Sequence, residues 1–348
     1  MYLKGATRMI RHKLRTLGFA TASAAVLCGG PAWALDGVVA SIKPVHSLVA
    51  AVMEGVGEPE LLVKGAASPH AYALRPSEAR ALEQAKVVFW VGEGMETFLA
   101  GPLETLGGNA RIVELVEAHD LVELDFREGG PFEAHDHGDH EGHDHAHDDD
   151  DDEGDHDGGD DHAHEGHGHE GHDHGAIDMH LWLDPSNAKA FVHEIEEALS
   201  AADPDNAATY EANADALNEK LDVLIAETDA ALAPVRGRGF VVFHDAYQYF
   251  ENRFDIQAAG SITVSPEAIP GAQRLTDIRA KVAELGATCI FAEPQFEPRL
   301  ISVVAEGTQA RTGVLDPLGA DLEDGPELYF ELIRNLATSL TTCLAGAS

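Results

Sequence analysis

Two sets of short apolar runs, each alternating with longer amphipathic stretches, constrain the fold of this chain more than any other feature. The runs lie at 37–42, 60–64, 86–92 and 111–115 in the first set and at 239–244, 256–262, 289–294 and 312–318 in the second. A strand, a helix and another strand at this spacing are typical of an open α/β sheet. We therefore predict an α/β protein with two similar lobes.

The stretch between the two sets predicts a long helix that joins the lobes. Asp203–Val235 contains no Gly, begins with a good N-cap residue before Pro204, and has apolar residues at helical spacing. One uninterrupted helix of about thirty residues would be about 45 Å long. A rod of this length would limit the relative motion of the lobes, which we place at 35–202 and 236–348. The alternative is two ordinary helices broken near Glu227 to Asp229.

The amino terminus predicts a secretory signal peptide over residues 1–34. Five basic residues and no acidic one precede the apolar stretch 17–28, and Ala32-Trp33-Ala34 follows as a small-x-small cleavage site. The apolar stretch is too short to span a membrane. We expect cleavage after Ala34 and a soluble mature chain in the periplasm. A lipid anchor on Cys28 is disfavoured, because Leu27 is not the small residue which that signal has before its cysteine.

Export also determines how the cysteines are interpreted. Only Cys289 and Cys343 remain after cleavage, and two cysteines in an exported chain predict one disulfide. On the loop-entropy model such a bridge stabilises by about 4 kcal/mol. It would hold the last helix to the lobe that carries Cys289. Two buried free thiols are the alternative.

Residues 133–175 differ from the rest of the chain. They contain 13 His and 18 Asp plus Glu, with no Lys or Arg and almost no apolar residue. Such a segment cannot bury enough surface to offset its chain entropy, so we predict a disordered insertion. Imidazole and carboxylate both bind divalent metals, and weak auxiliary metal sites are expected at His135, His137, His140, His143, His145, His147, His156, His162, His164, His167, His169, His172 and His174. A solvated low-complexity spacer is the alternative.

The overall charge excludes one class of partner. The chain has 61 Asp plus Glu against 23 Lys plus Arg, a formal net charge of −38. A surface this acidic does not bind phosphate backbones or anionic lipid, so we expect no nucleic-acid partner.

Three isolated histidines in structured contexts are better ligand candidates than the insertion. His70 follows a predicted strand and precedes a helix start, and His244 closes the strand GFVVFH. His180 begins an apolar, strand-like run that ends at Asp184-Pro185. Ligands of open α/β sheets collect at strand ends, which favours a site at His70 and His244. A structural role is the alternative for each of the three, and His46 is a weaker candidate.

Five segments in order, SPHAYALRPSEARAL, DMHLWLDPSNA, FVVFHDAYQYFENRF, SPEAIPGAQRLTDIRAKVAELGATCIFAEPQFEP and GVLDPLGADL, resemble the zinc-specific substrate-binding proteins of bacterial ABC transporters. The resemblance covers nearly the whole mature chain. It implies two α/β lobes joined by one long helix, with a single high-affinity zinc site in the cleft between them. It also implies that His70, His180 and His244 are the zinc ligands and that Cys289 pairs with Cys343. The expected partners are Zn²⁺ and an inner-membrane permease with its ATPase, and we expect a monomer.

The resemblance leaves the fourth zinc ligand open. Some relatives have Glu directly before the first ligand histidine, whereas this chain has Pro69. A water molecule or the carboxylate of Glu293 would then complete the site, with Glu297 a weaker candidate. Three imidazoles suit four-coordinate zinc better than manganese, although nickel and copper bind such sets too.

Two other function classes remain as alternatives. Three histidines with an open fourth position also hold catalytic zinc, so one alternative is a secreted metallohydrolase. The sequence contains no HExxH motif, and we expect no enzyme. The other alternative is a periplasmic zinc buffer or metallochaperone, in which the insertion does most of the binding.

Overall fold

The structure, a computed structural model, describes Tyr2, residues 35–127, Phe132, and residues 177–263, 271–284, 289–296 and 299–346. The predicted signal peptide, apart from Tyr2, and the predicted insertion with its thirteen histidines lie outside the described residues.

The first sheet is built from the first set of apolar runs. Its strands are all parallel in the order β2-β1-β3-β4, and they comprise β1 (Val38–Ala40), β2 (Glu60–Leu61), β3 (Val87–Trp90) and β4 (Arg111–Glu114). All four residues of the central strand β3 are buried, as expected for a parallel sheet covered on both faces. The four predicted strands are confirmed.

The second sheet repeats the same topology. The order is β6-β5-β7-β8, again all parallel, with β5 (Phe240–His244), β6 (Gly260–Thr263), β7 (Cys289–Ala292) and β8 (Arg311–Val314). In each sheet the second strand along the chain lies at one edge, and the first strand lies between the second and the third. The prediction of two similar α/β units is confirmed.

Helices and short 3₁₀ turns connect the strands. The α-helices before the link are α1 (Lys43–Val52), α2 (Pro76–Gln84), α3 (Thr97–Leu106) and α4 (Pro185–Ala202). Those after it are α6 (Gln248–Phe254), α7 (Ala272–Glu284), α8 (Arg299–Ala305) and α9 (Leu328–Ala345). The 3₁₀ turns include η1 (Pro69–Ala71), η2 (Leu115–Glu117) and η4 (Leu181–Leu183).

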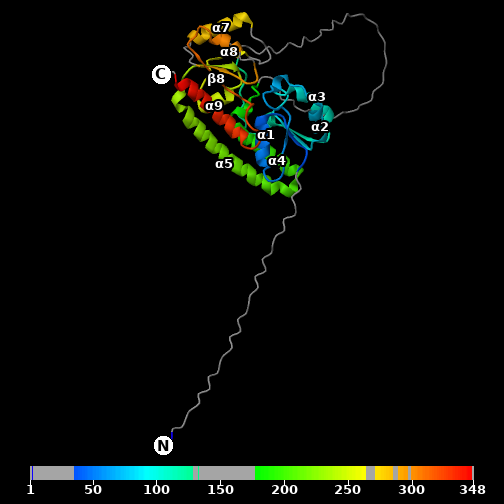
Figure 1. Cartoon of the computed structure of the whole chain (residues 1–348). Helices are drawn as coiled ribbons and strands as arrows, with labels where there is room; N and C mark the ends of the chain where they lie inside the picture. The colour runs from blue at the N-terminus through cyan, green and yellow to red at the C-terminus, as the bar shows by residue number, and fades with distance from the viewer. Residues whose placement is uncertain are drawn as a thin grey trace, which may run out of the picture. The chain divides into compact units, whose positions relative to one another are not determined.

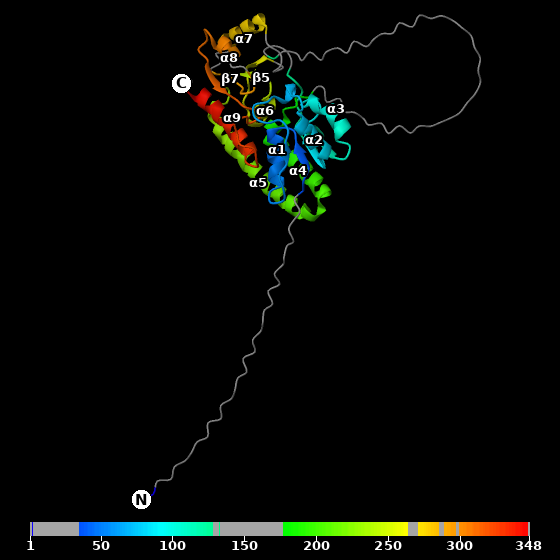
Figure 2. The ribbon, with the colours of Figure 1, turned by 45° about the vertical axis from the view of Figure 1, so that its right-hand side comes forward.

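One long helix lies between the two sets of strands. Helix α5 runs without a break from Ala207 to Leu232, 26 residues, between the 3₁₀ turns η5 (Pro204–Asn206) and η6 (Ala233–Val235). At 1.5 Å per residue it is about 39 Å long. It packs against α4 and α9, and it lies alongside α9 in both ribbon views (Figures 1 and 2). The predicted long helix is confirmed, and the alternative break near Glu227 to Asp229 is wrong.

The two sheets share one hydrophobic core. The same cluster of buried side chains includes Phe89 of β3 in the first sheet and Phe291 of β7 in the second. Buried hydrogen bonds add to this packing: Trp182 Nε1 donates to Pro317 O (2.8 Å), and Tyr329 Oη donates to Trp182 O (2.7 Å). Because residues 34–348 form one unit by their contacts, the lobe boundaries at 202 and 236 stay predictions.

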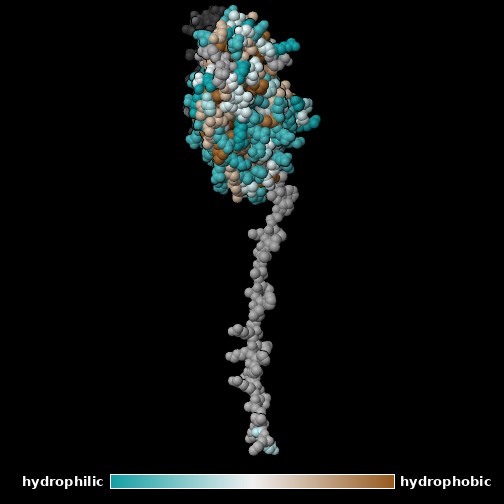
Figure 3. Space-filling view, turned by 60° about the vertical axis from the view of Figure 1, so that its left-hand side comes forward, coloured by the Kyte–Doolittle hydropathy of each residue, from teal (hydrophilic) through white to brown (hydrophobic). Residues whose placement is uncertain are grey.

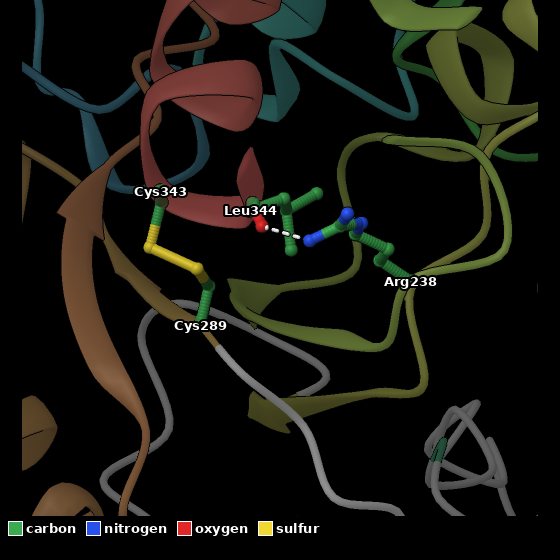
Figure 4. Close-up of a disulfide and its surroundings, with 4 residues drawn as sticks. All are labelled: Arg238, Cys289, Cys343 and Leu344. Atoms are coloured by element: carbon green, nitrogen blue, oxygen red, sulfur yellow. Dashed lines mark hydrogen bonds between the residues drawn. A yellow bond between two sulfur atoms is a disulfide. The ribbon is translucent and has the colours of Figure 1, made fainter. Parts of the chain in front are cut away.

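A disulfide joins Cys289, the first residue of β7, to Cys343 in α9 (Figure 4). The two Cα atoms are 6.1 Å apart. Next to the bridge, Arg238 Nη1 donates to the carbonyl oxygen of Leu344 at 2.7 Å. The predicted bridge is confirmed, and it fastens the last helix to the second sheet.

On the face shown in Figure 3, hydrophobic residues are scattered among hydrophilic ones. Within the described residues, every helix is too short or too polar to cross a lipid bilayer.

Candidate metal centre

His70 lies in the 3₁₀ turn η1, after β2 and before α2. Pro69 occupies the first position of this turn, where its fixed φ and missing N–H are tolerated. Ser68 is the N-cap residue, but its side chain makes no capping hydrogen bond. The turn follows β2 and places the His70 ring beside those of His180 and His244.

His180 lies directly before the 3₁₀ turn η4, so the predicted strand-like run at this point is wrong. The turn residues Leu181, Trp182 and Leu183 are all buried, so they do not show the alternation of a half-exposed strand. Asp184 then caps α4 by accepting from the backbone N–H of Ser186 (2.8 Å). The chain therefore enters α4 at Pro185, five residues after His180.

His244 is the last residue of β5, an interior strand of the second sheet. Its neighbours β6 and β7 pair with β5 on either side. The residue is 3% exposed. Its backbone is thus fixed by the sheet, as expected for a residue at a strand end that faces a binding site.

The fold brings the three imidazoles together. Ring centroids are 5.4 Å apart for His70 and His180, 5.9 Å for His70 and His244, and 5.2 Å for His180 and His244. The Nε2 atoms of His180 and His244 are 3.3 Å apart, and one nitrogen from each of the three rings lies within 4.8 Å of the others. Two nitrogens bound tetrahedrally to one Zn²⁺ would be about 3.3 Å apart, given a Zn–N bond of about 2.0–2.1 Å. The geometry fits an N₃ metal site.

Carboxylates orient two of the three rings. Asp178 Oδ1 lies 2.7 Å from His180 Nδ1 and accepts the backbone N–H of the same residue at 3.0 Å. Glu293 makes the same pair of contacts with His244, at 2.8 Å to Nδ1 and 3.2 Å to the backbone nitrogen. A carboxylate on Nδ1 sets the tautomer and leaves Nε2 as the metal-binding atom.

The surroundings of His70 and His244 shift their pKa values in opposite directions. Burial lowers the pKa of His70 well below its usual value, and repulsion from His180 and His244 lowers it further. Burial also lowers the pKa of His244, but the charge and hydrogen bond of Glu293 outweigh it and the pKa is raised. His70 is therefore held neutral, the form that binds metal.

The other predicted ligands are not part of this group of three nitrogens. Glu293 contacts Nδ1 of His244 and also lines the cavity beside the three rings, so its place as fourth ligand stays a prediction. His46 is buried elsewhere, with its Nε2 3.0 Å from Pro59 O. Glu297 lies outside the described residues, as do the thirteen histidines of the insertion. Sequence reasoning missed Asp178, although its position two residues before His180 was a signal.

A small cavity adjoins the three rings. Its volume is about 10 Å³, close to what one water molecule requires. Besides the histidines, its lining includes Ser68, Gln295 and Phe296. Within the part of the chain that the structure describes, this cavity has room for about one water-sized ligand beside the rings.

Comparison with known proteins shows the family of this chain. The family model "Zinc-uptake complex component A periplasmic" matches residues 38–343. The chain belongs to this family. It is 60% identical to the high-affinity zinc uptake system protein ZnuA of Brucella suis biovar 1 over 333 residues, which is 95% of this chain and 99% of that protein. The corresponding protein of Paracoccus denitrificans is 43% identical over 97% of this chain and all of its own length.

A solved structure supports the fold. A crystal structure of ZnuA superimposes with a TM-score of 0.67 and covers 88% of this chain and 98% of its own. The two sequences are 22% identical, so the likeness establishes the two-sheet architecture alone.

Proposed function

We propose that this chain is the zinc-binding component of a periplasmic high-affinity zinc uptake system, and that it passes Zn²⁺ to an ABC permease driven by its ATPase. The observation that carries the proposal is the convergence of His70, His180 and His244, from three distant segments, on one point. The family and its zinc-uptake relatives support Zn²⁺ as the ion that is carried.

Each residue has a separate role in capture. The three histidines would donate neutral nitrogens to the ion, and Asp178 and Glu293 would hold two of the rings in the binding orientation. The two carboxylates also bring two negative charges near an ion with two positive ones. A buried doubly charged ion needs such compensation, because burial removes its hydration.

The shared core bears on how zinc enters and leaves. Since Trp182 and Tyr329 join the two halves through buried hydrogen bonds, large relative motion would break well-packed contacts. Bound zinc at about a hundredfold excess over Kd would stabilise the fold by about 2.7 kcal/mol. Release from such a site is slow unless it is forced, which is the role we assign to the permease.

Cavity size distinguishes this function from the hydrolase alternative. A cavity of about 10 Å³ admits one small ligand but not an organic substrate beside the ion. A metallohydrolase needs that space for its substrate.

Calorimetry on the mature chain tests the capture site. We expect one tight zinc ion plus weaker ones, and His244→Ala should weaken the tight ion more than about 100-fold, the upper end of the loss for an outer-shell partner. His193→Ala, at an exposed position, is the matched control. Deleting residues 133–175 should remove weak ions and keep the tight one. Tight binding that survives in His244→Ala would contradict the assignment.

Uptake of radioactive zinc tests delivery. In zinc-depleted medium, cells lacking this chain should accumulate little zinc, and the wild-type gene should restore uptake whereas His244→Ala should not. A zinc buffer or metallochaperone predicts the opposite result, because uptake would then be normal without the chain. Sedimentation of the zinc-loaded chain would test the predicted monomer.

A further inference from the structure

In the described part of the chain, two uncharged polar atoms in the lining of the metal cavity lack a partner, and a third lining atom, Glu293 Oε2, makes no hydrogen bond of its own but lies 2.8 Å from Nδ1 of His244. Ser68 Oγ and Gln295 Oε1 are buried, and neither has a hydrogen-bond partner among the described residues. Both residues line the cavity that contains the three imidazoles. Buried polar atoms in native proteins are nearly always satisfied, so two such atoms at one cavity indicate a missing ligand.

The orientation of Gln295 is fixed by its other end. Its Nε2 donates to Asp316 Oδ1 at 2.9 Å. The Asp316 carboxylate also accepts the backbone N–H groups of Leu318 (3.1 Å), Gly319 (3.0 Å) and Ala320 (2.6 Å). Since Asp316 acts as an acceptor throughout, the amide nitrogen is the end that faces it. The amide oxygen is left as an acceptor on a firmly held side chain.

The hydroxyl of Ser68 is also available to a ligand, because it does not cap its own helical turn. Serine at the N-cap of a helical turn usually accepts from a backbone N–H in that turn. Ser68 is at the N-cap of η1 but makes no such bond. The hydroxyl lies only two residues from His70 and is buried beside the site.

The coordination chemistry leaves one position for this ligand. Three imidazoles fill three of the four positions that Zn²⁺ prefers. Glu293 is bonded to Nδ1 of His244, on the far side of that ring from the cluster. We propose that the fourth ligand of the captured ion is a water molecule, which donates its two protons to Gln295 Oε1 and Ser68 Oγ. This inference rests on the proposed function.

The arrangement would also select among metals. A cavity of about 10 Å³ holds about one water, so it cannot supply the several oxygen ligands of a six-coordinate ion. Ions that accept a tetrahedral N₃O set, such as Zn²⁺ and Co²⁺, fit the site. Mn²⁺, which prefers octahedral oxygen-rich coordination, does not. Gln295 and Ser68 are thus positioning residues with a role in specificity.

Cobalt provides a spectroscopic test on the full mature chain. We expect Co²⁺-loaded wild-type protein in ¹⁷O-enriched water to show an ¹⁷O coupling by electron–nuclear double resonance, and its visible bands to indicate four-coordination. Gln295→Met and Ser68→Ala should each weaken Co²⁺ binding about fivefold, the effect of one lost hydrogen bond. Gln295→Met should also lower the pKa of the bound water, because the lost acceptor stabilises water relative to hydroxide. Gln248→Met is the matched control, since Gln248 donates to Asp125 O away from the cavity.

Each outcome separates this inference from the proposed function. No ¹⁷O coupling in the wild type, or variants that match Gln248→Met in affinity and in the pKa of the water, would overturn the water proposal while tight binding through the histidines remains. Equal binding by wild type and His244→Ala would instead overturn the proposed function. Coupling in the wild type together with the predicted shifts in Gln295→Met and Ser68→Ala would establish the inference.

Discussion

Oδ1 of Asp178 lies 2.7 Å from Nδ1 of His180, only two residues later in the chain. The same oxygen accepts the backbone N–H of His180 at 3.0 Å, so one carboxylate fixes both the ring and its backbone. Glu293, the residue after β7 and distant in sequence, does the same for His244. The two histidines are therefore held in the binding geometry before any metal arrives, which reduces the entropy lost on binding.

Replacing Asp178 should weaken zinc binding without removing it. Loss of a carboxylate partner of a metal-binding histidine costs about 10- to 100-fold in affinity. We expect Asp178→Asn near the lower end, because the amide oxygen still accepts, and Asp178→Ala near the upper end. Competition against a chromophoric chelator measures both. The control is Asp222→Asn, which loses only an exposed pair with Lys189. Equal affinities for Asp178→Ala and the control would show that the contact does not orient His180.

The elements could be predicted from the sequence because their signals are local. Apolar runs of five to seven residues marked all eight strands, and the lack of glycine marked α5. The turn after His180 could not be predicted in this way. It depends on Trp182, whose indole and carbonyl bond to Pro317 and Tyr329 from the far end of the chain.

The site was predictable only in part for the same reason. Histidines near strand ends can be recognised in the sequence. Which ring nitrogen a carboxylate contacts cannot be predicted from the sequence, because it depends on the packing of distant segments. Glu293 follows β7, and only the pairing of β7 with β5 brings it to Nδ1 of His244. The sequence therefore indicated a carboxylate near the site but not its role.

Glu96 should make stability depend on pH. Its fully buried carboxylate accepts from Ser41 Oγ (2.5 Å) and from the backbone of Val91 and Gly92, yet burial raises its pKa to about 7 from 4.5. The folded protein therefore binds an extra proton between these values. This contribution to stability is complete below pH 4.5 and is lost as the pH rises through about 7.

Urea unfolding of the metal-free protein at pH 5 and pH 8 measures the effect of Glu96. The free energy of unfolding of the wild type should fall by about 2–3 kcal/mol more than that of Glu96→Gln over this interval. Glu104→Gln, at an exposed position, should behave like the wild type. A Glu96→Gln variant with the wild-type pH dependence would show that Glu96 does not titrate in this range.

Removing the disulfide should lower stability but leave the metal site intact. Cys289→Ser with Cys343→Ser frees α9 from β7 and should cost about 4 kcal/mol. For a chain of this size we expect the Tm to fall by about 6 °C in calorimetry. Zinc affinity at 25 °C should stay unchanged, because the bridge is at the opposite end of β7 from Glu293. Reduction of the wild type should reproduce the shift, and an unchanged Tm would show that the bridge adds no stability.

Arg127 should stabilise the region next to His244 through two buried carboxylates. It donates from Nε to Asp245 Oδ2 (3.0 Å) and from Nη1 to Glu251 Oε2 (2.7 Å). The acidic side chains are 7% and 4% exposed, and burial raises the pKa of both. Arg127→Met leaves these charges unpaired and should cost about 3–5 kcal/mol.

A charge-neutral combination tests this interpretation of Arg127. Adding Asp245→Asn and Glu251→Gln to Arg127→Met removes the unpaired charges and should restore most of the lost free energy of unfolding. Because Asp245 directly follows His244, zinc affinity should fall in the single variant and recover in the triple variant. Arg334→Met, which breaks an exposed pair with Glu227, is the control. A triple variant as unstable as Arg127→Met would mean that packing of the arginine side chain, and not its charge, supports the end of β5.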